Sequence, residues 1–404
     1  MAVWIGVVTQ NTAHEAYTTP AEKAGDPGEA DVQARAMADE LNAHGGILHR
    51  KVRLRFYNAE VAKTSQDPAT AGEAACTYFT QDTHVVAVWN VSTELDQVAG
   101  FRECLAKRKV LLFTAALRAV TDAELHRLAP YYLHTLMVSW EELGPVLAQR
   151  LKAQGWLHGW DSTTGQPAAA NTKIGILSDN TPPGKRAAAV LTKAFADLGY
   201  PGALTFQYSD ASQGQAASVQ YFKANRVTHV IVTDVELTAF QYYAATQIYY
   251  PRIGMTSYNL PYGNLQASGF TPPKANNGAM GVGWASLLDV DAAHAPAPGS
   301  NARHCLAVMK KVDQAPADGR TKQLFALSGC DTFSLIARGA QDAGGFAAAG
   351  IYASIMRTSE SFSPANGFAA ALSAAKPFLQ GMVRDLSWNS SCSCMEYGAA
   401  TIRL

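Results

Sequence analysis

Polar side chains follow a strongly apolar run near residue 90, where a folded chain can present them to a ligand. The run Val85–Trp89 is short and rich in β-branched residues, which is typical of a strand buried on both faces. Ser92 and Thr93 come next, and a helix follows them. Their hydroxyls and the free N–H groups of a helix start can bind a carboxylate. The same hydroxyls can instead cap the helix, so both roles remain open.

Two acidic side chains, Asp234 and Glu236, follow a second apolar run, Thr228–Thr233. A carboxylate at this place can pair with the ammonium group of a ligand. Glu236 also stands at the start of a helix, where acidic residues are favoured by the helix dipole alone. Asp179, after a third apolar run, is expected to cap its own loop.

The six cysteines form three local pairs, a pattern that disulfides in an exported protein would explain. Helices that flank one strand can lie side by side, so bridges are predicted within the first two pairs. The last pair shares one face of a strand, but its ring would be small and easily reduced. Six free thiols in a cytosolic protein are the alternative, and no metal or cofactor is expected. The pairs are Cys76 with Cys104, Cys305 with Cys330, and Cys392 with Cys394.

Length and composition narrow the class of protein. A chain of 404 residues is expected to form two domains. Lys plus Arg and Asp plus Glu are equal at 33 each, which argues against a nucleic-acid partner. No apolar run is long enough to span a bilayer, and no signal peptide is recognisable. Phosphate-loop, dinucleotide-binding, zinc-protease and serine-hydrolase motifs are missing, so no enzymatic activity is expected.

Strands and helices alternate in both halves of the chain, which predicts α/β architecture with parallel sheets and right-handed crossovers. In such sheets, ligands bind at loops that leave the carboxyl ends of strands. The segment after residue 278 looks shared between the halves and includes a predicted helix at Phe368–Ala375. The predicted strands cover residues 3–8, 52–57, 85–89, 110–113, 173–177, 203–208, 228–233, 252–256, 280–284 and 398–404, and the main helices cover 31–44, 68–79, 140–153, 185–198, 213–225, 236–248, 301–312 and 330–343.

This order of segments resembles the type I periplasmic binding protein fold, in the branched-chain amino-acid-binding branch of ABC transporter receptors. The resemblance covers essentially the whole chain, and the helix end Asn-Ala-x-Gly-Gly-Ile is its most specific motif. It implies two doubly wound parallel-sheet lobes joined by a three-segment hinge. The motifs are Ile5-Gly-Val-Val, Leu41-Asn-Ala-His-Gly-Gly-Ile, Thr83-His-Val-Val-Ala-Val, Lys173-Ile-Gly-Ile-Leu-Ser-Asp-Asn, Val227-Thr-His-Val-Ile-Val and Leu386-Ser-Trp.

The resemblance also implies a biological setting. Lobe I would comprise residues 1–134 and 279–378, and lobe II residues 135–278 and 379–404. The lobes would close on a small organic ligand, with hinges near Tyr131–Ser139, Asn276–Gly281 and Gln380–Val383. The protein would be monomeric and extracytoplasmic, tethered in many bacteria by a lipid on an upstream cysteine, and would deliver its ligand to an ABC permease.

The family places ligand contacts in the loops after the strands, and Trp89 could either stack on the ligand or end the core of its strand. The family's amino-acid fingerprint is degraded here, which puts an ordinary amino acid in doubt and favours a larger or less polar ligand. The candidate ligand-binding residues are Trp89, Asn90, Ser92, Thr93, Thr114, Ala115, Ala116, Asn180, Thr181, Asp234, Glu236 and Tyr258.

Two other classes of the same fold stay open. A cytosolic effector-sensing domain would normally carry a DNA-binding headpiece and would have little use for paired cysteines. A receptor ectodomain would carry a membrane span. The ligand itself could be an amino acid, a peptide-like compound, or an aromatic or other organic acid.

Overall fold

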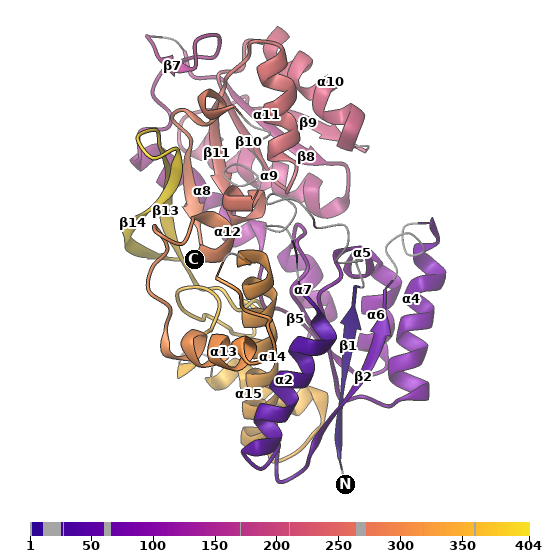
Figure 1. Cartoon of the computed structure of the whole chain (residues 1–404). Coiled ribbons are helices and arrows are strands. Elements are labelled where there is room, and N and C mark those ends of the chain that lie inside the picture. Colours follow the sequence, from indigo (N-terminus) through magenta and orange to yellow (C-terminus); the bar gives the residue numbers. More distant parts are fainter. Residues whose placement is uncertain are drawn as a thin grey trace. The chain divides into compact units, whose positions relative to one another are not determined.

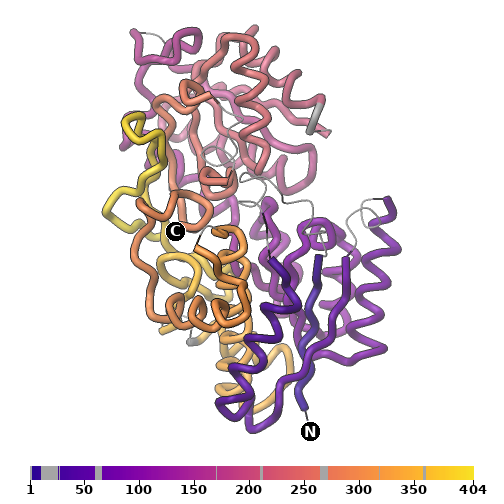
Figure 2. Tube along the Cα trace, viewed as in Figure 1, coloured from indigo at the N-terminus to yellow at the C-terminus, as the bar shows by residue number. Residues whose placement is uncertain are grey.

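The computed structural model describes residues 2–10, 26, 28–59, 66–169, 171–209, 211–263, 272–317, 319–358 and 361–404. The chain divides into two compact units, coloured along the sequence in Figures 1 and 2. Unit 1 comprises Met1–Leu117, Asp122–Met137 and Ala297–Gly381. Unit 2 comprises Arg118–Thr121, Val138–Pro296 and Met382–Leu404.

Unit 1 is built on a five-stranded sheet in which every pairing is parallel, in the order β2-β1-β3-β4-β5. Its central strands are continuous apolar runs because both faces of the sheet are covered, and β3 and β4 are buried along their whole length. The predicted parallel α/β class is therefore confirmed. The strands are β1 (Val3–Thr9), β2 (Val52–Asn58), β3 (Ala87–Asn90), β4 (Leu111–Thr114) and β5 (Tyr132–His134).

The helices of unit 1 begin and end where the sequence has capping residues. Asp67 caps α4 by accepting a hydrogen bond from the Thr70 N–H, with Pro68 in the first turn. Gly45 and Gly46, both at positive φ, end the segment after α2. The helices are α2 (Ala30–Ala43), α4 (Pro68–Thr77) continued by the π-helical turn η2 (Tyr78–Asp82), α5 (Thr93–Gln97), α6 (Ala99–Lys107), α7 (Asp122–Leu128), α13 (Ser300–Lys310), α14 (Arg320–Ala343) and α15 (Ala348–Thr358).

Unit 2 contains a seven-stranded mixed sheet in the order β14-β13-β12-β11-β10-β8-β9. The five strands from β12 to β9 are parallel, and the antiparallel hairpin β13–β14 extends the edge beside β12. A separate two-stranded ribbon joins β6 (Trp160–Asp161) to β7 (Gln166–Pro167). The strands are β8 (Ile174–Asp179), β9 (Leu204–Tyr208), β10 (His229–Val232), β11 (Arg252–Thr256), β12 (Met280–Gly283), β13 (Met382–Asn389) and β14 (Cys394–Arg403).

The helices of unit 2 cover this sheet, and α8 is bonded to β13. Ser139 caps α8 through the Glu142 N–H, and Arg150 on the same helix forms a two-pronged salt bridge with Asp385 of β13. Among the residues that the structure describes, no helix combines the length and the apolar character of a bilayer span. The helices are α8 (Trp140–Ala153), α9 (Pro182–Asp197), α10 (Ala211–Ala224), α11 (Leu237–Thr246) and α12 (Ser286–Asp289), with the short turns η3 (Ser257–Asn259) and η5 (Pro273–Asn276).

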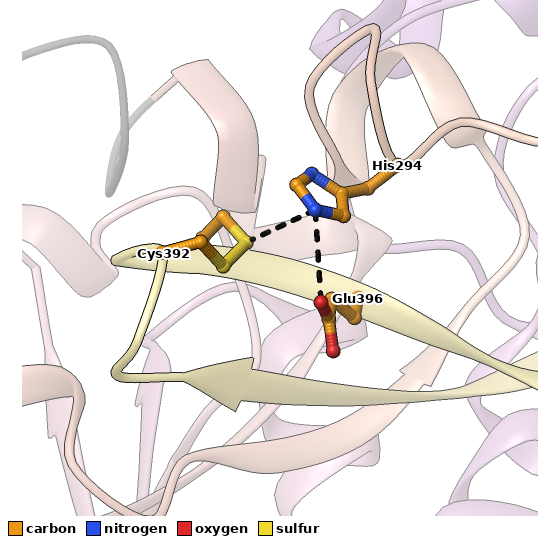
Figure 3. A group of neighbouring side chains, drawn as sticks. His294, Cys392 and Glu396 are labelled. Atoms are coloured by element: carbon orange, nitrogen blue, oxygen red, sulfur yellow. Dashed lines mark hydrogen bonds and ion pairs between the residues drawn. A yellow bond between two sulfur atoms is a disulfide. The ribbon is translucent and has the colours of Figure 1, made fainter.

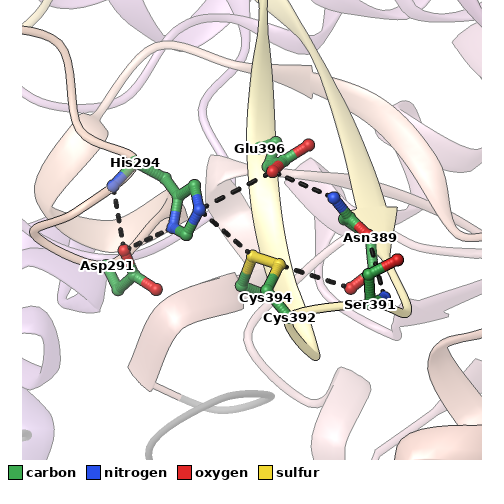
Figure 4. The surroundings of a disulfide bond; sticks show 7 residues. All are labelled: Asp291, His294, Asn389, Ser391, Cys392, Cys394 and Glu396. Atoms are coloured by element: carbon green, nitrogen blue, oxygen red, sulfur yellow. Dashed lines mark hydrogen bonds and ion pairs between the residues drawn. A yellow bond between two sulfur atoms is a disulfide. The ribbon is translucent and has the colours of Figure 1, made fainter.

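The structure contains all three predicted disulfides. Their Cα–Cα separations are 6.1 Å for Cys76–Cys104, 6.2 Å for Cys305–Cys330 and 5.2 Å for Cys392–Cys394. The first joins α4 to α6, the helices on either side of β3 in the sequence, as expected. The third spans the turn of the β13–β14 hairpin (Figure 4).

Three features of the C-terminal half differ from the sequence-based expectations. The helix predicted at Phe368–Ala375 is wrong, because this segment forms turns and isolated bridges such as Ala370 with Gln380. Helix α15 was not predicted, and α14 starts ten residues earlier than expected, at Arg320. The middle crossing between the units follows Pro296 rather than residue 278, because β12 is hydrogen bonded into the sheet of unit 2 on both of its sides.

Candidate functional site

The loop after β3 in unit 1 is held together by its own side chains. The Asn90 carboxamide accepts a hydrogen bond from the Ser92 N–H at 3.0 Å and donates one to the Ser92 carbonyl at 3.1 Å. The Ser92 hydroxyl accepts from the Leu95 N–H at 3.1 Å and so caps α5. Both side chains are fully or almost fully buried. The capping role predicted for Ser92 is confirmed, and its hydroxyl is engaged inside the loop.

Two threonines link this loop to the loop after β4. Thr93 Oγ1 accepts a hydrogen bond from the Leu117 N–H at 3.0 Å, and Thr114 Oγ1 accepts one from the Ala116 N–H at 3.2 Å. Thr114, Ala115 and Ala116 are fully buried, whereas Thr93 is half-buried. Of the residues whose hydroxyls were predicted to bind a carboxylate in this unit, Thr93 is therefore the most accessible.

Glu94, in the first turn of α5, is an acidic residue that was not among the predicted candidates. One of its carboxylate oxygens accepts hydrogen bonds from the Gln10 side chain at 2.8 Å and from the Ser92 hydroxyl at 3.3 Å. A carboxylate in this position repels a ligand carboxylate and attracts an ammonium group. Its only sequence signal is an acid in a first helical turn, which is common without any ligand.

Trp89 lies in the core of unit 1. Its side chain has no exposed surface and meets the Phe333 ring edge-on, with ring centroids 6.3 Å apart. Gly329 of α14 lies so close that an added Cβ would approach the Trp89 ring to 2.8 Å. Of the two roles predicted for Trp89, this packing corresponds to the last core side chain of the strand.

In unit 2, the acidic loop after β10 meets the end of β9. Asp234 is 8% exposed and accepts a hydrogen bond from the Tyr208 hydroxyl at 2.7 Å and from the Glu236 N–H at 3.0 Å. Strands β9 and β10 both flank β8, so their carboxyl ends lie at one edge of the sheet. Tyr208 was not among the predicted candidates; it is the last residue of β9, and its contact with Asp234 depends on the pairing of the strands.

The surroundings of Asp234 favour its neutral form when no cation is present. Burial raises the pKa of Asp234 to about 7, and the negative charges of Asp179 and Glu236 also raise it, against the hydrogen bonds from Glu236 and Tyr208. Burial and the Asp234 charge raise the pKa of Tyr208 as well. Burial likewise raises the pKa of the half-buried Glu236. A cationic group placed here would favour ionised carboxylates, so this acidic group can recognise an ammonium ion.

The loop after β8 supplies the remaining polar groups of this edge. Asp179 accepts hydrogen bonds from the Thr181 N–H at 3.0 Å and from the Thr181 hydroxyl, so it caps its own loop as predicted. Thr181 in turn caps α9 through the Gly184 N–H at 3.2 Å. Asn180 and Thr181 are exposed, and the Asn180 N–H donates to the Tyr208 carbonyl at 2.7 Å. Their positions leave both side chains accessible to solvent.

Tyr258 lies in an aromatic cluster of unit 2. Its ring stacks on Trp140 with centroids 5.1 Å apart and meets Trp284 edge-on at 5.5 Å. Its hydroxyl donates to the carbonyl of Val138, the first residue of the long segment Val138–Pro296 of unit 2. Tyr258 is fully buried, and its side chain holds the backbone of Val138 in place.

Comparisons with known proteins place this geometry in a family. A model of the periplasmic binding protein family matches residues 12–381. No curated protein sequence matches the chain.

Solved structures share the fold over the whole chain at low identity. A branched-chain amino-acid ABC transporter protein from Thermus thermophilus with bound valine is 13% identical, with a TM-score of 0.69, covering 100% of this chain and 97% of the other. A solute-binding protein of an ABC transporter from Rhodopseudomonas palustris, in complex with 3,4-dihydroxybenzoic acid, is 12% identical with a TM-score of 0.66. The match covers 100% of this chain and 97% of the other. A fatty-acid ABC transporter substrate-binding protein from Thermomonospora curvata is 12% identical with a TM-score of 0.64. The match covers 100% of this chain and 92% of the other.

The family model spans most of the chain, and the two α/β units match these structures throughout. The chain therefore belongs to the periplasmic binding protein family and has the type I fold of the substrate-binding proteins of branched-chain amino-acid ABC transporters.

Proposed function

We propose that this chain is an extracytoplasmic solute-binding protein that captures a small organic ligand bearing an ammonium group and delivers it to an ABC permease. The observation that carries the ligand class is the buried Asp234 carboxyl group. It lies at the carboxyl edge of the unit 2 sheet, bonded by Tyr208 and close to the charges of Asp179 and Glu236. An ionised carboxylate in such a buried place is best stabilised by a cation.

The ligands of the similar structures differ widely, from valine to dihydroxybenzoic acid. The fold alone therefore leaves the ligand open, and the side chains of this chain must decide it. In unit 1, the hydroxyls of Ser92 and Thr114 are engaged within their own loops, and Glu94 adds a negative charge. These features favour an amine or a larger amino compound over an ordinary α-amino acid.

We further propose that loops of both units contact the ligand. Thr93 would contribute from unit 1, and Asn180, Asp234 and Glu236 from unit 2, with hinge motion in the crossing segments around residues 137–138, 296–297 and 381–382. Only a ligand that binds the closed form better than the open form can shift the protein toward closure. Small-angle scattering with saturating ligand should then show a smaller radius of gyration, and an unchanged value would exclude closure.

A thermal-shift screen of amines, each paired with the corresponding compound lacking the amino group, tests the ligand class. A compound at 100 times its Kd adds about 2.7 kcal/mol to the free energy of unfolding, which gives a clear shift in Tm. Stabilisation only by the amino members supports the proposal. Stabilisation by the matched compounds without nitrogen would contradict it.

Two variants test whether the ammonium group of a hit binds at Asp234. Asp234→Asn keeps a side chain of the same shape without the charge and should lower the affinity for an amine hit at least about tenfold, the scale of one charged hydrogen bond. Asp197→Asn serves as the control, because Asp197 pairs with Lys193 on the exposed surface of α9. Equal affinity for the hit in both variants would show that the ammonium group binds elsewhere.

A further inference from the structure

The turn of the β13–β14 hairpin brings four potential metal ligands together within unit 2. His294 comes from the segment after α12, and Cys392, Cys394 and Glu396 come from the hairpin (Figures 3 and 4). One ligand atom from each residue lies within 4.8 Å of those of all the others. The set combines two sulfurs, an imidazole nitrogen and a carboxylate oxygen, which are the donor types that zinc prefers.

The distances around His294 match the edges of a zinc tetrahedron. Its Nε2 atom lies 3.6 Å from the Cys394 Sγ atom and 3.6 Å from a Glu396 carboxylate oxygen. Zinc bonds of about 2.3 Å to sulfur and about 2.0–2.2 Å to nitrogen or oxygen place neighbouring ligand atoms roughly 3.3–3.8 Å apart in a tetrahedron. Little movement of the imidazole and the carboxylate is therefore needed to bind zinc.

Outer partners hold these ligands in the required orientation (Figure 4). Asp291 accepts a hydrogen bond from the His294 Nδ1 atom at 2.7 Å, which leaves the Nε2 lone pair facing Cys394 and Glu396. The Asn389 amide donates to the Glu396 carboxylate at 3.0 Å. A carboxylate that accepts a hydrogen bond from the second ring nitrogen is the usual arrangement behind a zinc-bound imidazole.

The two cysteines differ in access to solvent. Cys394 is buried, whereas Cys392 lies exposed in the turn, beside Ser393 in the left-handed region. In the structure their sulfurs are joined as a disulfide, in which neither sulfur is a thiolate ligand. Exposed disulfides are the ones that thiols attack most easily, and here Cys392 is the exposed residue of the pair.

We propose that Cys392 and Cys394, when reduced, form a four-ligand zinc site with His294 and Glu396, so that the hairpin turn alternates between a disulfide and a metal-bound state. The reductant is a dithiol: its two sulfurs become a disulfide, while two electrons and two protons pass to Cys392 and Cys394. Zinc then displaces both thiol protons. Four protein ligands leave no open position, so the site is structural, and it ties the segment after α12 to the hairpin.

No local sequence pattern indicates this site. Cys392 and Cys394 lack a nearby second pair of ligands, and His294 lies 100 residues before Cys394. The chain brings them together because β13 pairs with β12, and the segment that carries His294 follows β12 and α12.

Cobalt(II) is the probe for the first experiment, because thiolate ligands give it a strong charge-transfer band and a tetrahedral site gives it intense visible bands. The full chain, reduced anaerobically by a dithiol that is then removed, should bind one cobalt ion with the spectrum of two thiolates. Zinc should displace the cobalt, and a weakly buffered titration should release two protons per zinc. The oxidised protein should give no such spectrum.

Variants separate this site from the other cysteines. The double variant Cys392→Ser/Cys394→Ser keeps the four remaining cysteines, so a cobalt–thiolate spectrum in this variant would overturn the proposal. His294→Ala should weaken binding more than about 100-fold and Asp291→Asn about 10–100-fold, the range for outer partners. Circular dichroism of the oxidised variants checks folding. Unchanged metal affinity in His294→Ala, or no metal bound by the reduced wild-type protein, would also refute the site.

Discussion

The ionisation of Asp234 predicts a specific dependence of stability on pH. Asp234 is 8% exposed, and its pKa is raised to about 7, whereas an aspartate of the unfolded chain has a pKa of about 3.9. Between these values the folded state binds one more proton than the unfolded state. The free energy of unfolding must then fall by about 1.4 kcal/mol per pH unit, and the slope must level off above pH 7. From pH 5 to pH 7, the loss from this one group is about 2 kcal/mol.

Asp234→Asn should remove this part of the dependence. The Asn carboxamide can accept from the Glu236 N–H and donate to the Tyr208 hydroxyl, as a protonated Asp234 would, so the variant should resemble wild type at pH 5. Urea unfolding of both proteins, followed by tryptophan fluorescence at each pH unit from 5 to 8, gives the difference directly. The variant should become more stable than wild type by about 2 kcal/mol at pH 7. Parallel curves would show that Asp234 is already ionised, and would remove the basis for its role as a cation site.

The buried packing and the bridges of unit 1 give further expectations. Trp89→Ala removes a fully buried ring packed on Phe333 and should cost about 3–5 kcal/mol of stability by urea unfolding; a neutral effect would contradict its core position. Gly329→Ala places a methyl group 2.8 Å from the same ring and should cost about 1–3 kcal/mol, measured in the same way, and an increase in stability would refute the contact. Loss of the Cys305–Cys330 bridge, which closes a separation of 25 residues, should cost about 3 kcal/mol, and a Tm within error of wild type would argue against the bridge.

The sequence was sufficient for most of the fold because local patterns and tertiary packing agree there. The amphipathic segment Trp140–Ala153 begins after Ser139, a good capping residue, and the helix has those bounds. In contrast, Phe368–Ala375 is rich in alanine and reads as a helix, but its backbone instead pairs with the segment around Gln380. Such pairing depends on residues brought close only by the fold, so propensity fails there.

The positions of the candidate loops at the strand ends were predictable, but the hydrogen bonding of their side chains was less so. The loops at strand ends follow from the parallel order, which the sequence indicated. Whether a hydroxyl in such a loop is free depends on distant backbone groups, as Thr93 shows by accepting from the Leu117 N–H. The same holds for Tyr208, whose contact with Asp234 requires β9 and β10 to flank one strand. Burial of Trp89 beside α14 likewise depends on a helix that begins about 230 residues later in the chain.

Hydrogen exchange with and without a saturating ligand tests the central claim most directly. Once an amine hit is known, amide exchange should slow in loops of both units, around residues 90–94 and 114–117 in unit 1 and residues 179–181 and 234–236 in unit 2. The β13–β14 turn provides an internal reference and should stay unchanged. Protection in these loops of both units is the result predicted for a solute-binding protein that captures its ligand at the strand ends. Protection confined to one unit, or found only outside these loops, would contradict it.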